Sequence, residues 1–117
     1  MKKNQYVLKL KSTNLSQDGG NQVTEIKEND GGFSIKTSFP QGTDEYTYFI
    51  KYENNDFIVK KVIHELSSWQ EDGNKVKVCE FRPQVNMQKS TDEIFRKLID
   101  GEKKAECVTK KNLIIMS

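Results

Sequence analysis

The chain is short, and its composition excludes several classes of protein. It has 117 residues, of which 34% are hydrophobic and 31% are charged, and its 19 basic residues nearly balance its 17 acidic ones. This length suits one domain, which we expect over residues 1–117, and recurring aromatic and β-branched runs separate the chain from a disordered one. The small net charge of +2 argues against a protein dedicated to nucleic-acid binding.

The first residues bear on the cellular compartment. Met1-Lys2-Lys3 could open a signal peptide, but no continuous apolar segment follows in residues 4–11. We therefore expect no membrane insertion. The protein is either cytoplasmic, or periplasmic if its natural form carries a signal peptide that this sequence lacks.

In the first third of the chain, alternating apolar residues predict β-strands. Residues 6–11 alternate as a half-buried strand, and residues 12–21 form a polar loop. Residues 23–39 predict a β-hairpin, because Asn29-Asp30-Gly31-Gly32 supplies the positive φ angles that a tight turn between two strands requires.

The middle of the chain predicts the centre of the sheet. Residues 45–52 form a strand with one shared face, which carries Tyr46, Tyr48, Ile50 and Tyr52. After a turn at residues 54–56, residues 57–66 are apolar on both faces, which is typical of a central strand. A polar loop with Trp69 and residues 72–74 leads into a further strand at residues 75–81.

One helix is predicted, after these strands. Ser90-Thr91-Asp92-Glu93 is a capping box, in which the Ser90 side chain accepts a hydrogen bond from the Glu93 amide. We expect a helix over residues 91–100, with Gly101 as a left-handed residue that ends it. Residues 105–109 could form a short strand, and residues 113–116 a last strand or a docking segment.

These elements together predict an α+β fold. We expect a mainly antiparallel meander sheet of five to seven strands, with the one helix of the C-terminal half packed on it.

The two cysteines, Cys79 and Cys107, allow a single pairing. A disulfide would close a loop of about 29 residues, contribute roughly 3 kcal/mol of stability and suit an oxidising compartment. Two free thiols are the alternative, and the sequence leaves both open.

His64 is the only histidine, and it lies in the predicted central strand. A half-buried structural role is the simpler interpretation. The alternative is a lone general base of a hydrolase, with Glu65 or Glu80 as its carboxylate partner.

Metal and cofactor sites have little support in the sequence. Cys79, Cys107 and His64 match no spacing known for zinc. The glycine pairs Gly19-Gly20 and Gly31-Gly32 lack the frame of a phosphate-binding loop and predict turns. We therefore expect no metal, no cofactor and no catalytic residue.

Aromatic residues are the candidates for contacts with a partner. Tyr46, Tyr48 and Tyr52 could form a stacking platform on an exposed sheet face, or a packed ladder beneath the helix. Trp69 either covers the edge of the core or anchors a partner, in which case Glu71 and Asp72 would form an acidic rim.

Residues 48–63, YFIKYENNDFIVKKVI, followed by a strand with a cysteine and a short helix, resemble the small β-rich immunity proteins encoded beside bacterial toxins. The resemblance implies a non-enzymatic protein that binds and inhibits one cognate toxin. It carries no functional residue over to this chain. Many immunity proteins that block basic nucleases are acidic, whereas this chain is nearly neutral, which leaves toxins that act on the cell envelope open.

Binding to a toxin is thus the leading hypothesis for function. The second is a small periplasmic ligand-binding domain with an apolar cavity between sheet and helix. The third is the hydrolase that uses His64.

Overall fold

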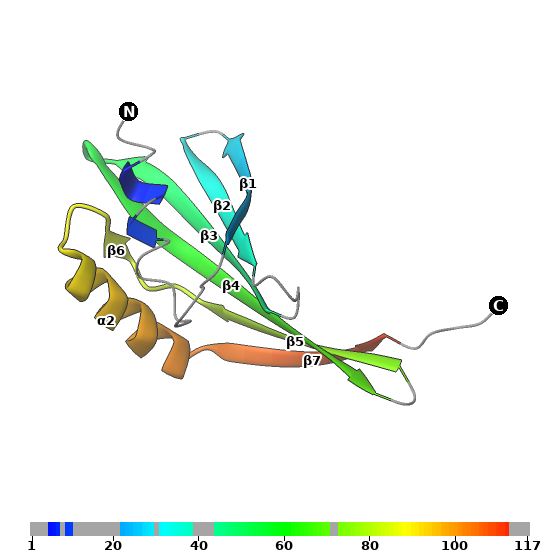
Figure 1. Cartoon of the computed structure of the whole chain (residues 1–117). Coiled ribbons are helices and arrows are strands. Elements are labelled where there is room, and N and C mark those ends of the chain that lie inside the picture. The colour runs from blue at the N-terminus through cyan, green and yellow to red at the C-terminus, as the bar shows by residue number, and fades with distance from the viewer. Residues whose placement is uncertain are drawn as a thin grey trace.

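The structure is a computed structural model that describes residues 5–7, 9–10, 22–29, 31–38, 44–70 and 73–112. In this part of the chain a helix packs on one face of an antiparallel sheet of seven strands (Figure 1). The elements are β1 (Gln22–Asn29), β2 (Gly32–Ser38), β3 (Asp44–Glu53), β4 (Asp56–Gln70), β5 (Gly73–Phe81), β6 (Val85–Asn86), α2 (Thr91–Lys103) and β7 (Glu106–Asn112). The predicted α+β meander is confirmed.

Strand order in the sheet follows the chain almost throughout. The order is β1-β2-β3-β4-β5-β7, with the short β6 paired to the start of β4 off this path. The strand predicted to be central, β4, lies in the middle. Within the described residues, β1 and β7 are the two edges of the sheet.

The β1–β2 hairpin is confirmed, and glycine explains its turn. Gly31 adopts a φ of +75°, the left-handed region that residues with a side chain seldom enter. At the next residue, Gly32, a Cβ atom would collide with the carbonyl oxygen of Ile50 on β3. The two glycines therefore serve different needs, one conformational and one steric.

A β-bulge shifts the phase of β4. Phe49 pairs with Lys61 and Ile50 pairs with Val59, so that Lys60 is the extra residue. Beyond the bulge, alternation places Val62 and His64 on the same face as Val59. The sequence pattern without a bulge groups Ile58 with Val62 and His64, and that assignment is wrong for Ile58.

The core fills the space between the sheet and α2. Every member is less than a tenth exposed, and together they come from the N-terminal helical residues, from β2 to β5, from α2 and from the segment before α2. They are Tyr6, Leu10, Phe33, Ile35, Tyr46, Tyr48, Ile50, Val59, Val62, Phe81, Val85, Met87, Ile94 and Leu98.

Residues 5–7 and 9–10 are helical, so the strand predicted over residues 6–11 is wrong. Tyr6 and Leu10 are both buried. Residues four apart lie on one face of a helix, and they also lie on one face of a strand. The spacing of Tyr6 and Leu10 therefore fits either structure. The segments predicted at residues 12–21 and 113–116 lie outside the described residues.

Helix α2 begins as predicted and ends later. The Ser90 hydroxyl accepts a hydrogen bond from the Glu93 amide at 3.3 Å, which confirms the cap. The helix continues to Lys103, so Gly101 is an internal residue and not the predicted left-handed terminus. A Cβ atom at Gly101 would lie 2.7 Å from Cδ2 of Phe81. Glycine is therefore required here for close packing of the helix on β5.

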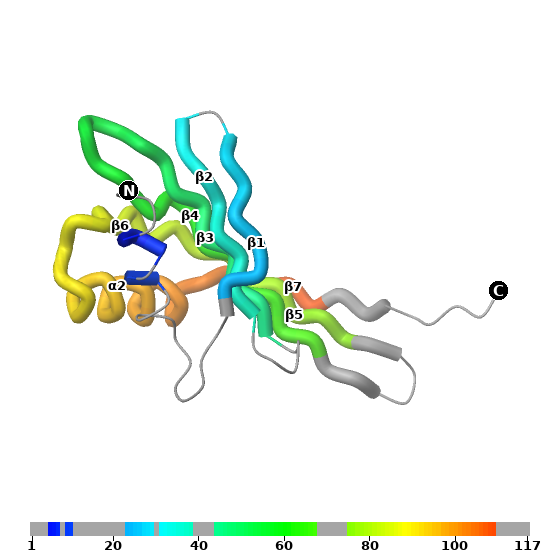
Figure 2. Tube along the Cα trace, turned by 45° about the horizontal axis from the view of Figure 1, so that its top comes forward, coloured from blue at the N-terminus to red at the C-terminus, as the bar shows by residue number. Residues whose placement is uncertain are grey.

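The β4–β5 hairpin is longer than the sequence predicts. Its ladder continues to Gln70 opposite Gly73, which places Trp69 in β4 opposite Asn74 and not in a loop. Backbone pairing needs no apolar side chains, so a polar segment can extend a strand. Figures 1 and 2 show β4, β5 and β7 running on together beyond α2.

Candidate functional site

Four side chains form a row across four strands on the face that α2 covers. Tyr46 of β3 lies opposite His64 of β4, His64 lies opposite Cys79 of β5, and Cys79 lies opposite Cys107 of β7. Directly opposed residues in antiparallel strands share a face and come within contact distance. The row therefore joins a polar cluster at His64 to the cysteine pair at the edge of the sheet.

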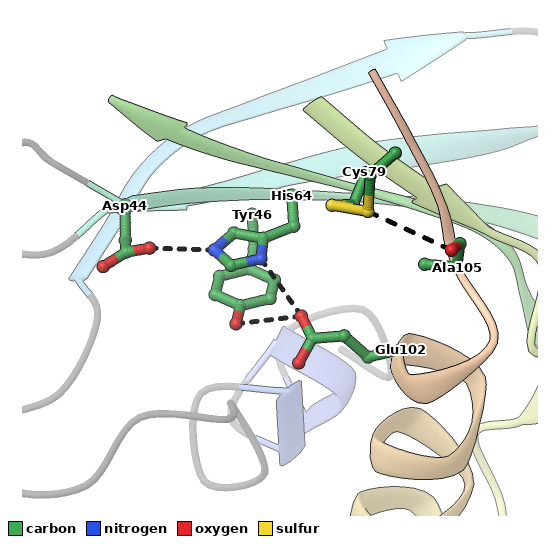
Figure 3. A network of polar contacts seen from close by, with 7 residues as sticks. Asp44, Tyr46, His64, Cys79, Glu102 and Ala105 are labelled. Carbon is green, nitrogen blue, oxygen red and sulfur yellow. Dashed lines mark hydrogen bonds and ion pairs between the residues drawn. A yellow bond between two sulfur atoms is a disulfide. The ribbon is translucent and has the colours of Figure 1, made fainter. Parts of the chain in front are cut away.

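His64 is bonded through both ring nitrogens (Figure 3). Nε2 lies 2.8 Å from Oδ1 of Asp44, and Nδ1 lies 3.1 Å from Oε1 of Glu102. The imidazole stacks on the ring of Tyr46, with the centroids 4.1 Å apart and the planes 6° from parallel. The Tyr46 hydroxyl donates to the same Glu102 oxygen at 3.2 Å.

The two carboxylates favour the protonated form of His64. Burial alone would lower the pKa of the imidazole, but its hydrogen bonds to Glu102 and Asp44 and their negative charges outweigh burial and raise that pKa above 6.5. Burial, reinforced by the charge of Glu102, raises the pKa of the Tyr46 phenol. The cluster thus favours an imidazolium between the two carboxylates, with a neutral tyrosine beside it.

This arrangement suits a structural role better than catalysis. With both N–H groups donating, neither nitrogen keeps a lone pair with which to accept a proton. The carboxylates are Asp44 and Glu102, so the alternative that paired His64 with Glu65 or Glu80 is wrong. Glu65 follows His64 directly and faces the other side of the sheet, while Glu80 pairs with Arg82 at 2.7 Å. The cluster fastens the C-terminal end of α2 to β3 and β4.

The Sγ atoms of Cys79 and Cys107 lie at disulfide-bonding distance, which favours the disulfide over two free thiols. Cys79 is only 8% exposed, whereas Cys107 is an exposed residue of the edge strand. The bond thus connects the buried side of the sheet to its edge.

The outer edge of β7 is open within the described residues, where β7 pairs only with β5. The Cα atoms of Cys79 and Cys107 are 4.0 Å apart, which indicates the narrow kind of antiparallel pair without mutual backbone hydrogen bonds. Cys107, and Thr109 two residues later, therefore direct their backbone N–H and C=O groups away from β5. Glu106 and Val108 bond to β5 instead.

A hollow of about 550 Å³ lies beside this edge, between β5, β7 and the end of α2. Val108, which lies on it, is 59% exposed. Apolar and charged side chains both line it around Gly101: the apolar ones are Val78, Phe81 and Val108, and the charged ones are Glu80, Arg82, Lys104 and Glu106. The hypothesis of a ligand-binding domain with an apolar cavity between sheet and helix stays a prediction.

The tyrosines proposed as partner contacts have different environments. Tyr46 and Tyr48 are 5% and 1% exposed, because α2 covers the face of β3 that they share, and they can form no open stacking platform. Tyr52, 51% exposed, remains accessible. Trp69 lies in β4, while Glu71 and Asp72 lie outside the described residues.

The described part of the chain was also searched for membrane-spanning helices and for metal-binding groups. No helix there is long and apolar enough to cross a membrane. Nor does it contain a group of three or more His, Cys, Asp or Glu side chains arranged to hold a metal ion.

No protein-family description, no curated protein and no solved structure matches this chain. Its function must therefore be inferred from its own residues.

Proposed function

We propose that this chain is a non-enzymatic protein-binding module that receives an extended segment of a partner at the open edge of β7. The observation that carries the proposal is the conjunction of this edge with the hollow beside it. The proposed partner is a bacterial toxin, which the chain inhibits in the manner of an immunity protein.

Backbone geometry supports strand addition at β7. The outward N–H and C=O groups of Cys107 and Thr109 are spaced as a partner strand requires. Sheets often protect an exposed edge with short strands, proline or charge, because an unprotected edge pairs with other chains. β7 carries charged residues at Glu106, Lys110 and Lys111, and the residues between them, from Cys107 to Thr109, are uncharged and exposed.

The hollow supports specificity for a side chain of the partner. In strand addition the backbone provides affinity, and pockets for alternate side chains provide specificity. A partner residue added opposite Val108 would cover that exposed side chain and lie next to the hollow. Its lining favours an apolar anchor flanked by a charged or polar group, because Val78 and Phe81 lie near Arg82 and Lys104.

The bonding of His64 and of the two cysteines also favours binding over catalysis. His64, the only histidine of the chain, is saturated by two carboxylates, and both cysteines are consumed in the disulfide. The disulfide further supports an oxidising compartment. A nearly neutral chain there suits a toxin of the cell envelope better than a basic nuclease.

The test first asks whether a toxin domain is encoded beside this chain's gene, and then measures binding of that purified domain; absence of such a domain would count against the toxin as partner. Thr109→Pro removes an outward N–H group, and an edge strand tolerates proline where no ladder bond is lost. Thr109→Ala keeps the N–H group and is the matched control. By calorimetry, we expect the wild type and Thr109→Ala to bind alike and Thr109→Pro to bind at least about tenfold more weakly, a change of about 1.4 kcal/mol.

Two results would contradict different parts of the proposal. Failure of the wild-type chain to bind the toxin would exclude the toxin as partner. Equal binding by the proline and alanine variants would exclude the β7 edge as the contact surface.

A further inference from the structure

We infer that the Cys79–Cys107 disulfide is a redox control on the β7 edge, and that a dithiol reductant opens it in the folded protein and releases β7. This inference rests on the proposed function for its biological meaning, because the strand that is released is the one proposed to bind the partner. The release itself is a property of the free chain.

Besides the disulfide, β7 is held by one ladder, which pairs it with β5 from Glu80–Glu106 to Asn74–Asn112. The strand packs mainly against β5, and none of residues 106–109, whose burial the structure describes, belongs to the core. Glu106, Cys107, Val108 and Thr109 are all exposed. Within the described residues no strand pairs with the outer edge of β7, so this ladder is its one backbone pairing. The covalent bond at Cys107 is therefore the strongest restraint on β7.

The two cysteines differ in exposure as residues, and this difference gives the proposed reaction a direction. Cys107 is exposed on the edge strand, while Cys79 is buried beside the core, in the row that contains His64 and Tyr46. Thiol–disulfide exchange depends on access to the sulfur that is attacked. A thiolate from solvent therefore attacks Sγ of Cys107, and Cys79 is the leaving group.

The reaction balances with an external dithiol as reductant. Its first thiolate bonds to Sγ of Cys107, the Cys79–Cys107 bond breaks, and the electron pair of that bond goes to Sγ of Cys79. The second thiol then loses its proton and attacks the first sulfur of the reductant, which expels Cys107 as a thiolate. The dithiol is oxidised to a disulfide by two electrons, and both cysteines take up protons from solvent.

Reduction leaves the rest of the sheet intact. Cys79 stays buried as a small apolar side chain, and β5 keeps its ladder with β4 from Val62–Phe81 to Gln70–Gly73. Release of β7 removes Glu106 and Val108 from the wall of the hollow. The edge and the hollow are thus lost together.

The experiment measures backbone amide exchange on the whole chain with and without dithiothreitol, in the absence of denaturant. Alkylation followed by mass measurement reports whether the disulfide has opened. We expect both thiols to be alkylated and the Glu106 and Val108 amides to exchange at least about tenfold faster, while the Tyr48 and Val62 amides change by less than about twofold. In Cys79→Ser/Cys107→Ser, the backbone amides should exchange as in the reduced wild type, and dithiothreitol should not change their rates.

Either of two outcomes overturns the inference. In one, the disulfide resists the reductant until urea unfolds the chain. In the other, it opens but the Val108 amide stays protected. If the double variant fails to fold, the measurements on the wild type alone still distinguish these two outcomes from the expected result. A toxin that binds oxidised and reduced chain equally would also contradict it, whereas absence of binding to oxidised chain would count only against the proposed function.

Discussion

His64 lies where three elements meet, and its bonds explain how they are held. Asp44 begins β3, His64 is near the middle of β4, and Glu102 is in the last turn of α2. A partly buried charge is stabilising only when it is paired and hydrogen-bonded. Here one imidazolium pairs with two carboxylates and stacks on Tyr46, so the charge itself joins the helix to the sheet.

Stability should therefore depend on pH through this single histidine. Because the pKa of His64 is raised in the folded protein, its contribution is complete below 6.5 and is lost as the pH rises through the folded-state value. We expect the free energy of unfolding in urea to fall over this range for the wild type. His64→Gln should lack that slope.

Proton NMR provides an independent check, because the chain has one imidazole. Its titration midpoint in the folded protein should lie above 6.5. A midpoint at or below that value, or the same pH slope in His64→Gln, would contradict the assigned cluster.

Two neighbouring tyrosines allow a matched comparison of hydroxyl groups. The Tyr46 hydroxyl donates to Glu102, whereas the buried Tyr48 hydroxyl has no hydrogen-bond partner among the described residues. Tyr46→Phe should lower the free energy of unfolding by about 1–2 kcal/mol, while Tyr48→Phe should be neutral or stabilising by up to about 1 kcal/mol. Both keep the ring, and urea unfolding measures the difference. Equal effects would refute the assignment of the two hydroxyls.

At the scale of elements, the features that the sequence predicts correctly are those that depend on a few adjacent residues. Asp30-Gly31-Gly32 and Ser90 to Glu93 marked the hairpin and the helix start, because turns and caps depend on a few adjacent residues. The bulge at Lys60 has no such local signature. The partners of His64 could not be predicted, since Asp44 and Glu102 approach it only through sheet register and helix docking.

Gly101 decides how closely α2 approaches the sheet. In an isolated helix, replacing glycine by alanine would gain about 1 kcal/mol. Here the added Cβ would lie 2.7 Å from the Phe81 ring, and overpacking of this kind typically costs about 1–3 kcal/mol. We expect Gly101→Ala to lower the urea midpoint.

Asp100, which precedes Gly101 in α2, provides a control substitution. Asp100 is exposed, so Asp100→Ala should change the stability little or raise it slightly, because the acidic side chain lies near the negative end of the helix. Stabilisation by Gly101→Ala would show that the helix does not approach β5 this closely.

At the scale of the whole molecule, the fold is elongated. The radius of gyration is 15.2 Å, compared with about 13 Å for a compact domain of this length. The longest dimension is 51 Å, which β4 with its 15 residues spans almost alone at about 3.3 Å per residue. An elongated chain with 34% hydrophobic residues has a small core, and a covalent link therefore matters more to its stability.

Removal of the disulfide should accordingly be costly. We expect Cys79→Ser/Cys107→Ser to lower the free energy of unfolding by about 2–4 kcal/mol, because the unfolded chain regains the freedom that the bond removes. Dithiothreitol should destabilise the wild type by a similar amount and leave the double variant unchanged. A loss below about 0.5 kcal/mol in the double variant would show that the bond constrains little.

The place of β7 in the strand order has a consequence for how the chain reaches this structure. From β1 to β5, each strand pairs with its neighbour in the chain, and such short-range contacts form quickly. By contrast, β7 can meet β5 only after residues 82–105 have folded back across the sheet. Cys107 therefore reaches Cys79 late, and oxidation of the pair follows the assembly of the other strands. We therefore expect a closed disulfide in a newly made chain to mark one whose other strands have already assembled.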